Sequence, residues 1–135
     1  MRRVVLVLRY VWASPASAVG LVFAAIAVLV GARTKLVDGA IEVAGGTVPR
    51  LIALLPRPFG FAAITLGHVI IGTDHAVLDR VRSHERVHVR QYERWGILFF
   101  PAYLVSSIIQ LARGRDPYLH NFFEREAFGR TGDEA

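Results

Sequence analysis

The longest uncharged run of the chain lies near the N-terminus, at residues 10–32. Arginines flank it on both sides, and Tyr10 and Trp12 stand at its leading end, where amphipathic rings prefer a membrane interface. As a helix these residues would extend about 35 Å, which is enough to cross the ~30 Å hydrocarbon core of a bilayer. The pattern therefore predicts a membrane helix within residues 1–33.

The same run is compatible with two other structures. Val30-Gly31-Ala32 is a small-residue ending that could be cleaved, so the segment could be a secretory signal. A buried helix of a soluble protein is the third possibility. Because arginines flank both ends, the charge pattern favours a cytoplasmic N-terminus only slightly.

Strand patterns occupy the middle of the chain. Residues 40–44 form a short run of alternating side-chain character, with the turn dipeptides Asp38-Gly39 before it and Gly45-Gly46 after it. Residues 61–73 are rich in branched side chains and bounded by glycines. Each run predicts one strand. Between them, Pro56, Pro58 and Gly60 predict an irregular connection. Two strands alone are marginal, and we therefore expect a short antiparallel sheet with helices packed on it.

Residues 75–95 predict a helix that Asp74 caps and Gly96 ends. At 3.6 residues per turn, an inward face collects two histidines among apolar side chains: Val77, Val81, His84, His88, Tyr92 and Trp95. Another face carries an arginine every fourth residue, at Arg82, Arg86, Arg90 and Arg94. This ridge is either a solvated face or a surface that contacts anionic lipid head groups.

Two further helices are expected in the C-terminal part. Residues 97–112 are apolar but short for a membrane span, and a proline and two serines interrupt them, which favours a buried or half-immersed helix over a second crossing. Asp116-Pro117 is a cap followed by proline at the first helical position. It predicts a last helix that runs from residue 117 to near Gly129.

Composition limits the classes of protein that remain. The 135 residues have room for one small domain after the N-terminal segment, residues 34–135. No cysteine is present, so a transition metal would be held by histidine and carboxylate. The net charge of +5 suits an anionic lipid surface or an acidic partner. It would also suit nucleic acid, but no helix-turn-helix, finger or aromatic-basic pattern supports that partner.

The strongest chemical signal is His84-Glu85-Arg86-Val87-His88, an H-E-x-x-H motif on the predicted helix. Imidazoles four residues apart meet over one turn and can reach one ion. Glu85 is rotated about 100° from His84, outside the ligand set but within reach of a metal-bound water. The motif thus supplies two zinc ligands and a general base for attack on a carbonyl. Two helix histidines in a polar notch are the plain alternative.

A third ligand has to come from beyond this helix. Candidates are His120, Glu124 and Glu126. The two glutamates lie about 200° apart on a helix and cannot both face the site, whereas His120 and Glu124 can. His68, within a strand, fits a structural role better than a ligand role, and Gln91, one turn beyond His88, is expected to pack against or orient its neighbours.

The chain resembles the gluzincin metallopeptidases from about Gly67 to Ala127. In many of them a glutamate on a later helix completes H-E-x-x-H and begins an E-x-x-A-D pattern, which Glu124-Arg125-Glu126-Ala127 matches until Phe128 replaces the aspartate. The resemblance implies Glu124 as third ligand and a cleft lined by the strand before the helix. The motifs "HERVHVRQYERWG" and "NFFEREA" are also similar to small bacterial membrane-associated proteins of unassigned function.

Together these patterns predict an α+β fold, with an N-terminal transmembrane helix and a small zincin-like domain that contains the active-site helix. Zn²⁺ would be bound by His84, His88 and Glu124, although two imidazoles and a carboxylate also suit iron. Glu85 would act as the base in hydrolysis of a peptide or protein substrate, at a bacterial inner membrane with a single span. His120 and Tyr118 could donate a hydrogen bond to the oxyanion.

Two other classes of function stay open at this point. About 100 residues scarcely suffice to build both walls of a deep cleft, so the protein could keep a metal-binding core in the membrane without catalysis. A basic module that binds the lipid surface, with histidines that hold no metal, is the third class. An enzyme should retain zinc and lose hydrolysis in a Glu85→Gln variant, whereas a structural site should show no zinc-dependent activity in either form. The third class predicts no bound metal.

Overall fold

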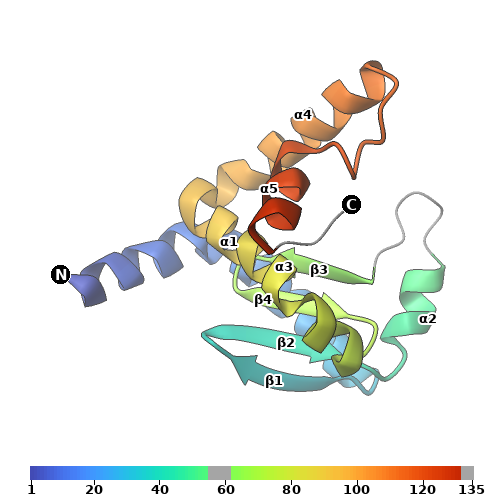
Figure 1. Ribbon diagram of the computed structural model, residues 1–135. Coiled ribbons are helices and arrows are strands. Elements are labelled where there is room, and N and C mark those ends of the chain that lie inside the picture. Colours follow the sequence, from blue (N-terminus) through green and yellow to red (C-terminus); the bar gives the residue numbers. More distant parts are fainter. Residues whose placement is uncertain (55–61, 132–135) are drawn as a thin grey trace.

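The computed structural model describes residues 1–54 and 62–131 (Figure 1). It has an α+β fold with a long apolar N-terminal helix, as predicted, and its sheet has four strands where the sequence predicted two. The irregular connection predicted around Pro56 lies outside the described residues. In chain order the elements are α1 (Arg2–Leu29), β1 (Arg33–Val37), β2 (Ala40–Ala44), α2 (Val48–Ala53), β3 (Ala63–Leu66), β4 (Val69–Gly72), α3 (His75–Trp95), the 3₁₀ turn η1 (Gly96–Leu98), α4 (Phe99–Ala112) and α5 (Phe122–Thr131).

The sheet has the strand order β1-β2-β4-β3 and is mixed. β1 pairs with β2, and β3 with β4, in antiparallel fashion, whereas β2 and β4 are parallel. The prediction of a purely antiparallel sheet was therefore wrong at its centre. The parallel pair arises because β2 reaches β4 through α2 and β3, a connection long enough to return the chain in the same direction.

The prediction of a single strand over residues 61–73 was also wrong. The chain reverses at Gly67, and the run forms the hairpin β3–β4. Gly67 has a φ of 64°, in the left-handed region that glycine adopts without a steric cost. β1 was missed for a different reason, since four of its five side chains are exposed and give no alternating pattern. A turn with positive φ at both Asp38 and Gly39 joins it to β2.

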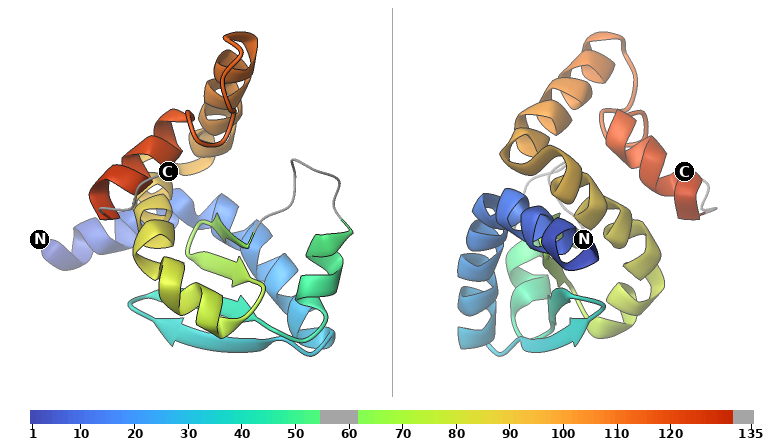
Figure 2. Two further views of the ribbon diagram at one scale, coloured as in Figure 1. Left: turned by 45° about the vertical axis from the view of Figure 1, so that its right-hand side comes forward. Right: turned by 90° about the vertical axis from the view of Figure 1, so that its left-hand side faces the viewer.

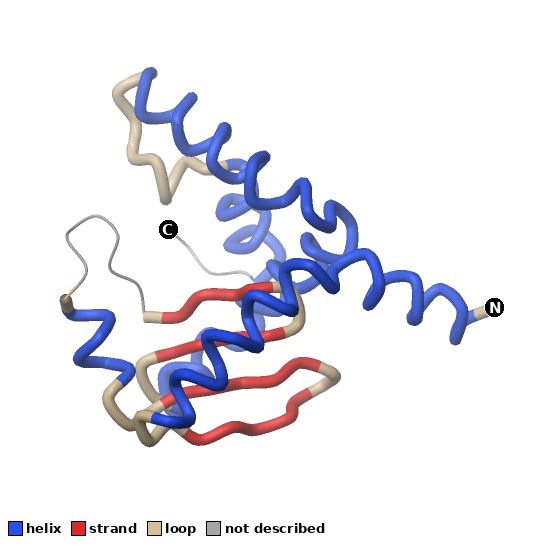
Figure 3. The backbone as a smooth tube through the Cα atoms, turned by 180° about the vertical axis from the view of Figure 1, so that it is seen from behind, coloured by secondary structure: helices blue, strands red, loops and turns tan. Residues whose placement is uncertain are grey.

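Alternate residues of the strands face two helices on opposite sides of the sheet. One face meets α1 through an apolar cluster that includes Ile41, Val43, Leu66, Val69 and Ile71. The other face meets α3 and includes Ala40, Ala44 and Ile70. Figure 1 shows α3 in front of the sheet, and Figure 3 shows α1 in front of it from behind. The sheet thus lies between the N-terminal helix and the helix that carries H-E-x-x-H.

α1 contacts the sheet through small side chains and exposes its large ones. Its buried residues are Ala13, Ala16, Gly20, Ala24 and Ala27. α1 and the stretch His75–Ala112, which runs through α3, η1 and α4, are the two helical stretches in the described residues long and apolar enough to cross a membrane. The prediction of an N-terminal helix apolar enough to span a bilayer is therefore confirmed. The alternative of a secretory signal remains compatible with the same helix.

α3 begins and ends where its sequence signals predict. The Asp74 carboxylate accepts a hydrogen bond of 2.8 Å from the Val77 N–H. Gly96 ends the helix with a φ of 58°, and a β-carbon at this position would meet the Trp12 ring of α1 at 2.6 Å. Half of the predicted inward stripe is buried, at His84, His88 and Tyr92, whereas Val77, Val81 and Trp95 are half-buried. The helix also buries Leu78 and Val89 against the sheet, outside the predicted stripe.

Two arginines of the predicted basic ridge bind the sheet instead of facing solvent. The Arg82 guanidinium donates two hydrogen bonds, of 2.8 and 2.9 Å, to the buried carboxylate of Glu42 on β2. Arg86 donates to the carbonyl oxygens of Val37 and Asp38. The solvated-face interpretation is therefore wrong for these two residues, because the twisted hairpin β1–β2 reaches up to this side of α3.

The C-terminal helices differ from expectation, α4 in its burial and α5 in its boundaries. α4 is exposed along most of its length, so it is not a buried helix. α5 begins at Phe122 rather than at residue 117, and it extends past Gly129. Asp116 caps only a turn, through the N–H groups of Tyr118 and Leu119. The side chain of Asn121 accepts from the Phe123 N–H and starts the helix proper.

Candidate metal site

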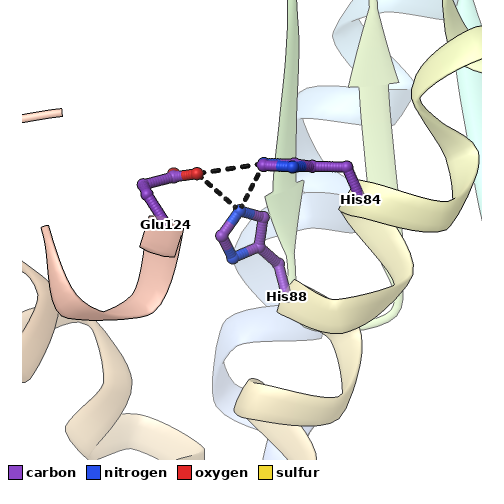
Figure 4. A group of neighbouring side chains, drawn as sticks. All are labelled: His84, His88 and Glu124. Atoms are coloured by element: carbon purple, nitrogen blue, oxygen red, sulfur yellow. Dashed lines mark hydrogen bonds and ion pairs between the residues drawn. The ribbon is translucent and has the colours of Figure 1, made fainter. Parts of the chain in front are cut away.

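α3 and α5 bring three donor atoms together (Figure 4). His84 and His88 lie one helical turn apart, and their Nε2 atoms are 3.3 Å from each other. Oε2 of Glu124, on α5, lies 3.0 Å from Nε2 of His84 and 3.2 Å from Nε2 of His88. All three residues are buried, with exposed fractions of 6%, 6% and 4%. Within the described residues this is the group of histidines and carboxylates that could hold a metal ion.

The dimensions of this triangle match a tetrahedral metal site. Donors that bind one zinc ion at about 2.0 to 2.1 Å lie about 3.3 to 3.4 Å from one another. The observed separations of 3.0 to 3.3 Å are close to that value. Two imidazoles and one carboxylate, with the fourth position open, are also the ligand chemistry of catalytic zinc. The residues therefore fit a divalent metal ion.

Gln91 sets the proton position on His88. Its amide N–H₂ group donates to the Phe123 carbonyl and to Oε1 of Glu126, both at 3.0 Å. The amide oxygen must then face His88, where it lies 2.8 Å from Nδ1 and accepts the N–H of that atom. A neutral imidazole with its proton on Nδ1 has a free lone pair on Nε2. The network thus presents the correct nitrogen to a metal.

The carboxylate of Glu124 is held in a similar way. Its second oxygen, Oε1, accepts a hydrogen bond of 2.8 Å from the Tyr103 hydroxyl on α4. This leaves Oε2 as the single donor that faces the histidines. Phe128 packs against the His84 ring with 4.6 Å between ring centroids.

Glu126 does not belong to the cluster of donor atoms. Its carboxylate accepts from Gln91 and lies 3.7 and 3.9 Å from the guanidinium groups of Arg94 and Arg130. The geometry therefore separates the two glutamates, as the helical angle between them requires. Glu124 faces the histidines, and Glu126 supports the residue that orients one of them.

The charges of the site are coupled. Burial alone would raise the pKa of Glu124, but the hydrogen bonds with His84 and His88 outweigh it and lower the pKa to about 2. Burial alone would lower the pKa of His88, yet its hydrogen bond and attraction to Glu124 raise that pKa above the ordinary value. The carboxylate is therefore ionised near neutral pH, as a metal ligand must be.

A groove of about 790 Å³ opens beside the three donor atoms. Glu85 lies in its wall and is buried, and one carboxylate oxygen accepts a hydrogen bond of 2.6 Å from the Thr65 hydroxyl on β3. Residues of β3 and the position before it, of α3, α4 and α5, and of the segment before α5 complete the lining: Ala62, Ala63, Ile64, Thr65, Val81, Tyr92, Phe99, Phe100, Tyr103, Asp116, Pro117, Tyr118 and Phe128.

The remaining predicted residues lie in different places. Tyr118 lines the groove and is 48% exposed. His120 is exposed and is not among the residues that line the groove. His68 lies away from the metal ligands, with Nε2 3.0 Å from a Glu93 carboxylate oxygen and Nδ1 3.3 Å from the Ser17 hydroxyl. These contacts join α1, the β3–β4 turn and α3, which agrees with the structural role predicted for His68.

Three supporting residues differ in how far the sequence could reveal them. Gln91 follows His88 by three positions on one helix, so its orienting role is open to local reasoning. Tyr103 and Thr65 give no such signal, because their partners Glu124 and Glu85 lie 21 and 20 residues away on other elements. Both became apparent only from the packed structure.

Comparison of the chain with protein-family models, with curated proteins and with solved structures finds no match.

Proposed function

We propose that the protein is a membrane-anchored, zinc-dependent hydrolase of peptide bonds. The observation that carries this proposal is the convergence of His84, His88 and Glu124 within 3.3 Å of one another beside an open groove. Glu85, in the wall of the same groove, supplies the general base that metal-assisted hydrolysis needs. Zinc in preference to iron is part of the proposal and follows the H-E-x-x-H pattern.

The chain's own residues have distinct tasks in this reaction. Zinc, when bound, supplies a Lewis acid that polarises the peptide carbonyl and lowers the pKa of water. Glu85 accepts a proton from the attacking water and returns it to the leaving nitrogen. The Thr65 hydroxyl donates to Glu85 and holds its carboxylate in the groove wall. Tyr118, one of the hydroxyl-bearing residues of the lining, donates a hydrogen bond to the oxyanion in this reaction.

The groove supports a peptide as the substrate class. One wall is β3, which is an edge strand of the sheet. An extended peptide can pair with such an edge through main-chain hydrogen bonds. The opposite wall is aromatic, with Phe99, Phe100 and Tyr103, and suits an apolar side chain next to the cleaved bond.

The location that we propose is a bacterial inner membrane. α1 is apolar enough to span a bilayer, and it begins with two arginines, Arg2 and Arg3. Basic residues before a membrane helix favour retention of that end on the cytoplasmic side. The helix would then hold the sheet and the groove close to the lipid.

A structural metal site is the second candidate function. The specific observation in its favour is the burial of the three ligands, each less than a tenth exposed. An ion at this place would cross-link α3 and α5. Structural zinc commonly stabilises small domains in this manner.

Metal analysis and proteolysis assays on three forms of the full chain separate these functions. We expect stoichiometric zinc in the wild type and in Glu85→Gln, and loss of zinc in His84→Ala. Cleavage of fluorogenic casein should occur with the wild type only. Zinc without any casein cleavage in the wild type would support the structural site, and equal zinc in His84→Ala and wild type would remove the metal site altogether. Thermal unfolding of each form checks that it is folded.

A further inference from the structure

α4 presents its apolar side chains outward. Most of its large apolar residues are between 43% and 64% exposed: Phe100, Leu104, Val105, Ile108, Ile109 and Leu111. Ile97 and Leu98 of η1 continue this surface, with exposures of 61% and 55%. A water-facing helix normally carries polar residues on its outer side. An apolar surface of this extent marks a site of contact with a partner or a membrane.

The inner side of α4 is the polar one. Nδ2 of Asn121 donates to the Tyr103 carbonyl and to the Ser107 hydroxyl, at 3.0 and 2.7 Å. The Ser106 hydroxyl accepts from the Phe122 N–H at 2.9 Å. The helix thus pairs its two serines with the residues at the start of α5 and leaves apolar side chains outside. This arrangement is the reverse of that in a helix which faces water, and it suits surroundings of hydrocarbon.

The N-terminal part of α1 indicates what those surroundings are. Five consecutive residues, Val4 to Leu8, are 44% to 62% exposed. Successive helical residues are rotated by about 100°, so these five cover the whole circumference. A second copy of the chain or another protein would cover one face of a helix. Lipid surrounds it on all sides.

Charge and position link α1 and α4 to the same bilayer. α1 contacts η1, the turn that leads into α4, and Figure 3 shows the two helices meeting on one side of the molecule. Both also project from the sheet-containing part of the chain (Figure 2). Arg2 and Arg3 lie at one end of this apolar surface, and Arg113 and Arg115 follow α4 at the other. Arginines at such ends reach anionic head groups.

We propose that the outer face of α4 lies in a lipid bilayer, in the interfacial region and alongside the N-terminal part of α1. The 14 residues of α4 extend about 21 Å, less than the ~30 Å of a hydrocarbon core. One face is bound to α5, so the helix lies in the interface and does not cross the membrane. Phe100 both lines the groove and belongs to the exposed surface, which brings the mouth of the groove next to the lipid.

The absence of cysteine allows a direct test with single-cysteine labels on the full chain. Ile108→Cys and Leu104→Cys place an environment-sensitive fluorophore on α4, and Ser83→Cys places it on the exposed side of α3. Each protein is reconstituted into vesicles of phosphatidylcholine and phosphatidylglycerol. Nitroxide groups on the lipid acyl chains should quench the two α4 labels several-fold more than the α3 label. Aqueous iodide should quench in the opposite order.

Two outcomes would overturn the proposal. Iodide quenching of the α4 labels as strong as that of the α3 label would mean that α4 faces water. Shielding of the α4 labels from both quenchers would mean that protein covers this surface. A second copy would be identified in that case by self-quenching that increases with the ratio of protein to lipid. The use of two α4 positions, one turn apart, guards against a local effect of one substitution.

Discussion

At His88 the orientation of one amide group decides which ring nitrogen is available to a metal. The Gln91 side chain has two donor hydrogens, and both are directed to acceptors on α5, at Phe123 and Glu126. Its oxygen is then left for Nδ1 of His88. Glu124 is arranged by the same logic, because Tyr103 occupies one of its two oxygens. Partners of this kind commonly affect metal affinity by 10- to 100-fold.

Replacement of Gln91 by methionine should weaken zinc binding about 10- to 100-fold, because it removes the acceptor for the Nδ1 proton and lets the ring change tautomer. The dissociation constant is measured by competition with a chromogenic chelator. Gln110→Met is the matched control, since Gln110 lies on α4 away from the donor atoms and its amide oxygen has no hydrogen-bond partner. Unchanged affinity in a folded Gln91→Met protein would contradict the assigned role.

The coupled charges predict how the stability of the metal-free protein depends on pH. The pKa of Glu124 is lowered from 4.5 to about 2, so its stabilising contribution is present above pH 4.5 and is lost as pH falls towards 2. The pKa of His88 is raised from 6.5, so its contribution is present below pH 6.5 and is lost as pH rises through the folded value. Thermal unfolding with chelator should therefore show this pair at its most stabilising between pH 4.5 and 6.5.

A control variant isolates that contribution. Glu124→Gln removes the ionisable group and should flatten this part of the pH profile on both sides. A profile of the same shape in wild type and variant would mean that other groups determine the pH dependence.

The secondary-structure elements are held in place partly by buried charge. Glu42, on β2, is 1% exposed, and it is paired with Arg82, on α3, whose side chain is 26% exposed. This pair ties the helix of the metal ligands to the sheet. Asn121 has a comparable role between α4 and α5, through its bonds to Tyr103 and Ser107. Each contact positions one of the two helices from which the metal ligands come.

Loss of Arg82 should therefore destabilise the fold. Arg82→Ala leaves the buried Glu42 carboxylate unpaired, which costs about 2 to 3 kcal/mol after allowance for the partial exposure of Arg82. Arg90→Ala, an exposed position on the same helix, should change the free energy of unfolding by less than about 0.5 kcal/mol. Urea unfolding of both variants measures the difference. Equal effects of the two substitutions would argue against a special role for the Glu42 pair.

For the molecule as a whole, the metal site joins parts of the chain that are far apart in sequence. His84 and Glu124 are 40 residues apart, and α4 lies between them in the chain. α4 touches the site through Tyr103 and carries the proposed lipid-facing surface on its other side. Occupation of the site would therefore connect the sheet, α3 and α5 to the helix at the membrane.

Zinc should accordingly stabilise the whole fold. A ligand that binds only the folded state adds about 2.7 kcal/mol when its free concentration is about 100 times its Kd. The midpoint of thermal unfolding in detergent should rise with zinc in the wild type and in Glu85→Gln, and it should not respond in His84→Ala. A rise of equal size in all three proteins would point to binding elsewhere on the chain.

The boundaries of α3 and the two histidine ligands of the site could be predicted from sequence alone. The cap at Asp74, the end at Gly96 and the turn between His84 and His88 depend on interactions within a few residues, which the order of amino acids specifies directly. The membrane-spanning potential of α1 is equally local, since it depends on length and hydropathy.

Only the tertiary structure decided the rest. The hairpin at Gly67, the parallel pairing of β2 with β4 and the start of α5 at Phe122 depend on which segments pack together. The choice of Glu124 over Glu126 was implied by a resemblance, but its geometry requires α5 to lie against α3. Contacts between distant residues depend on the competition among all possible packings, and a local pattern does not record the outcome of that competition.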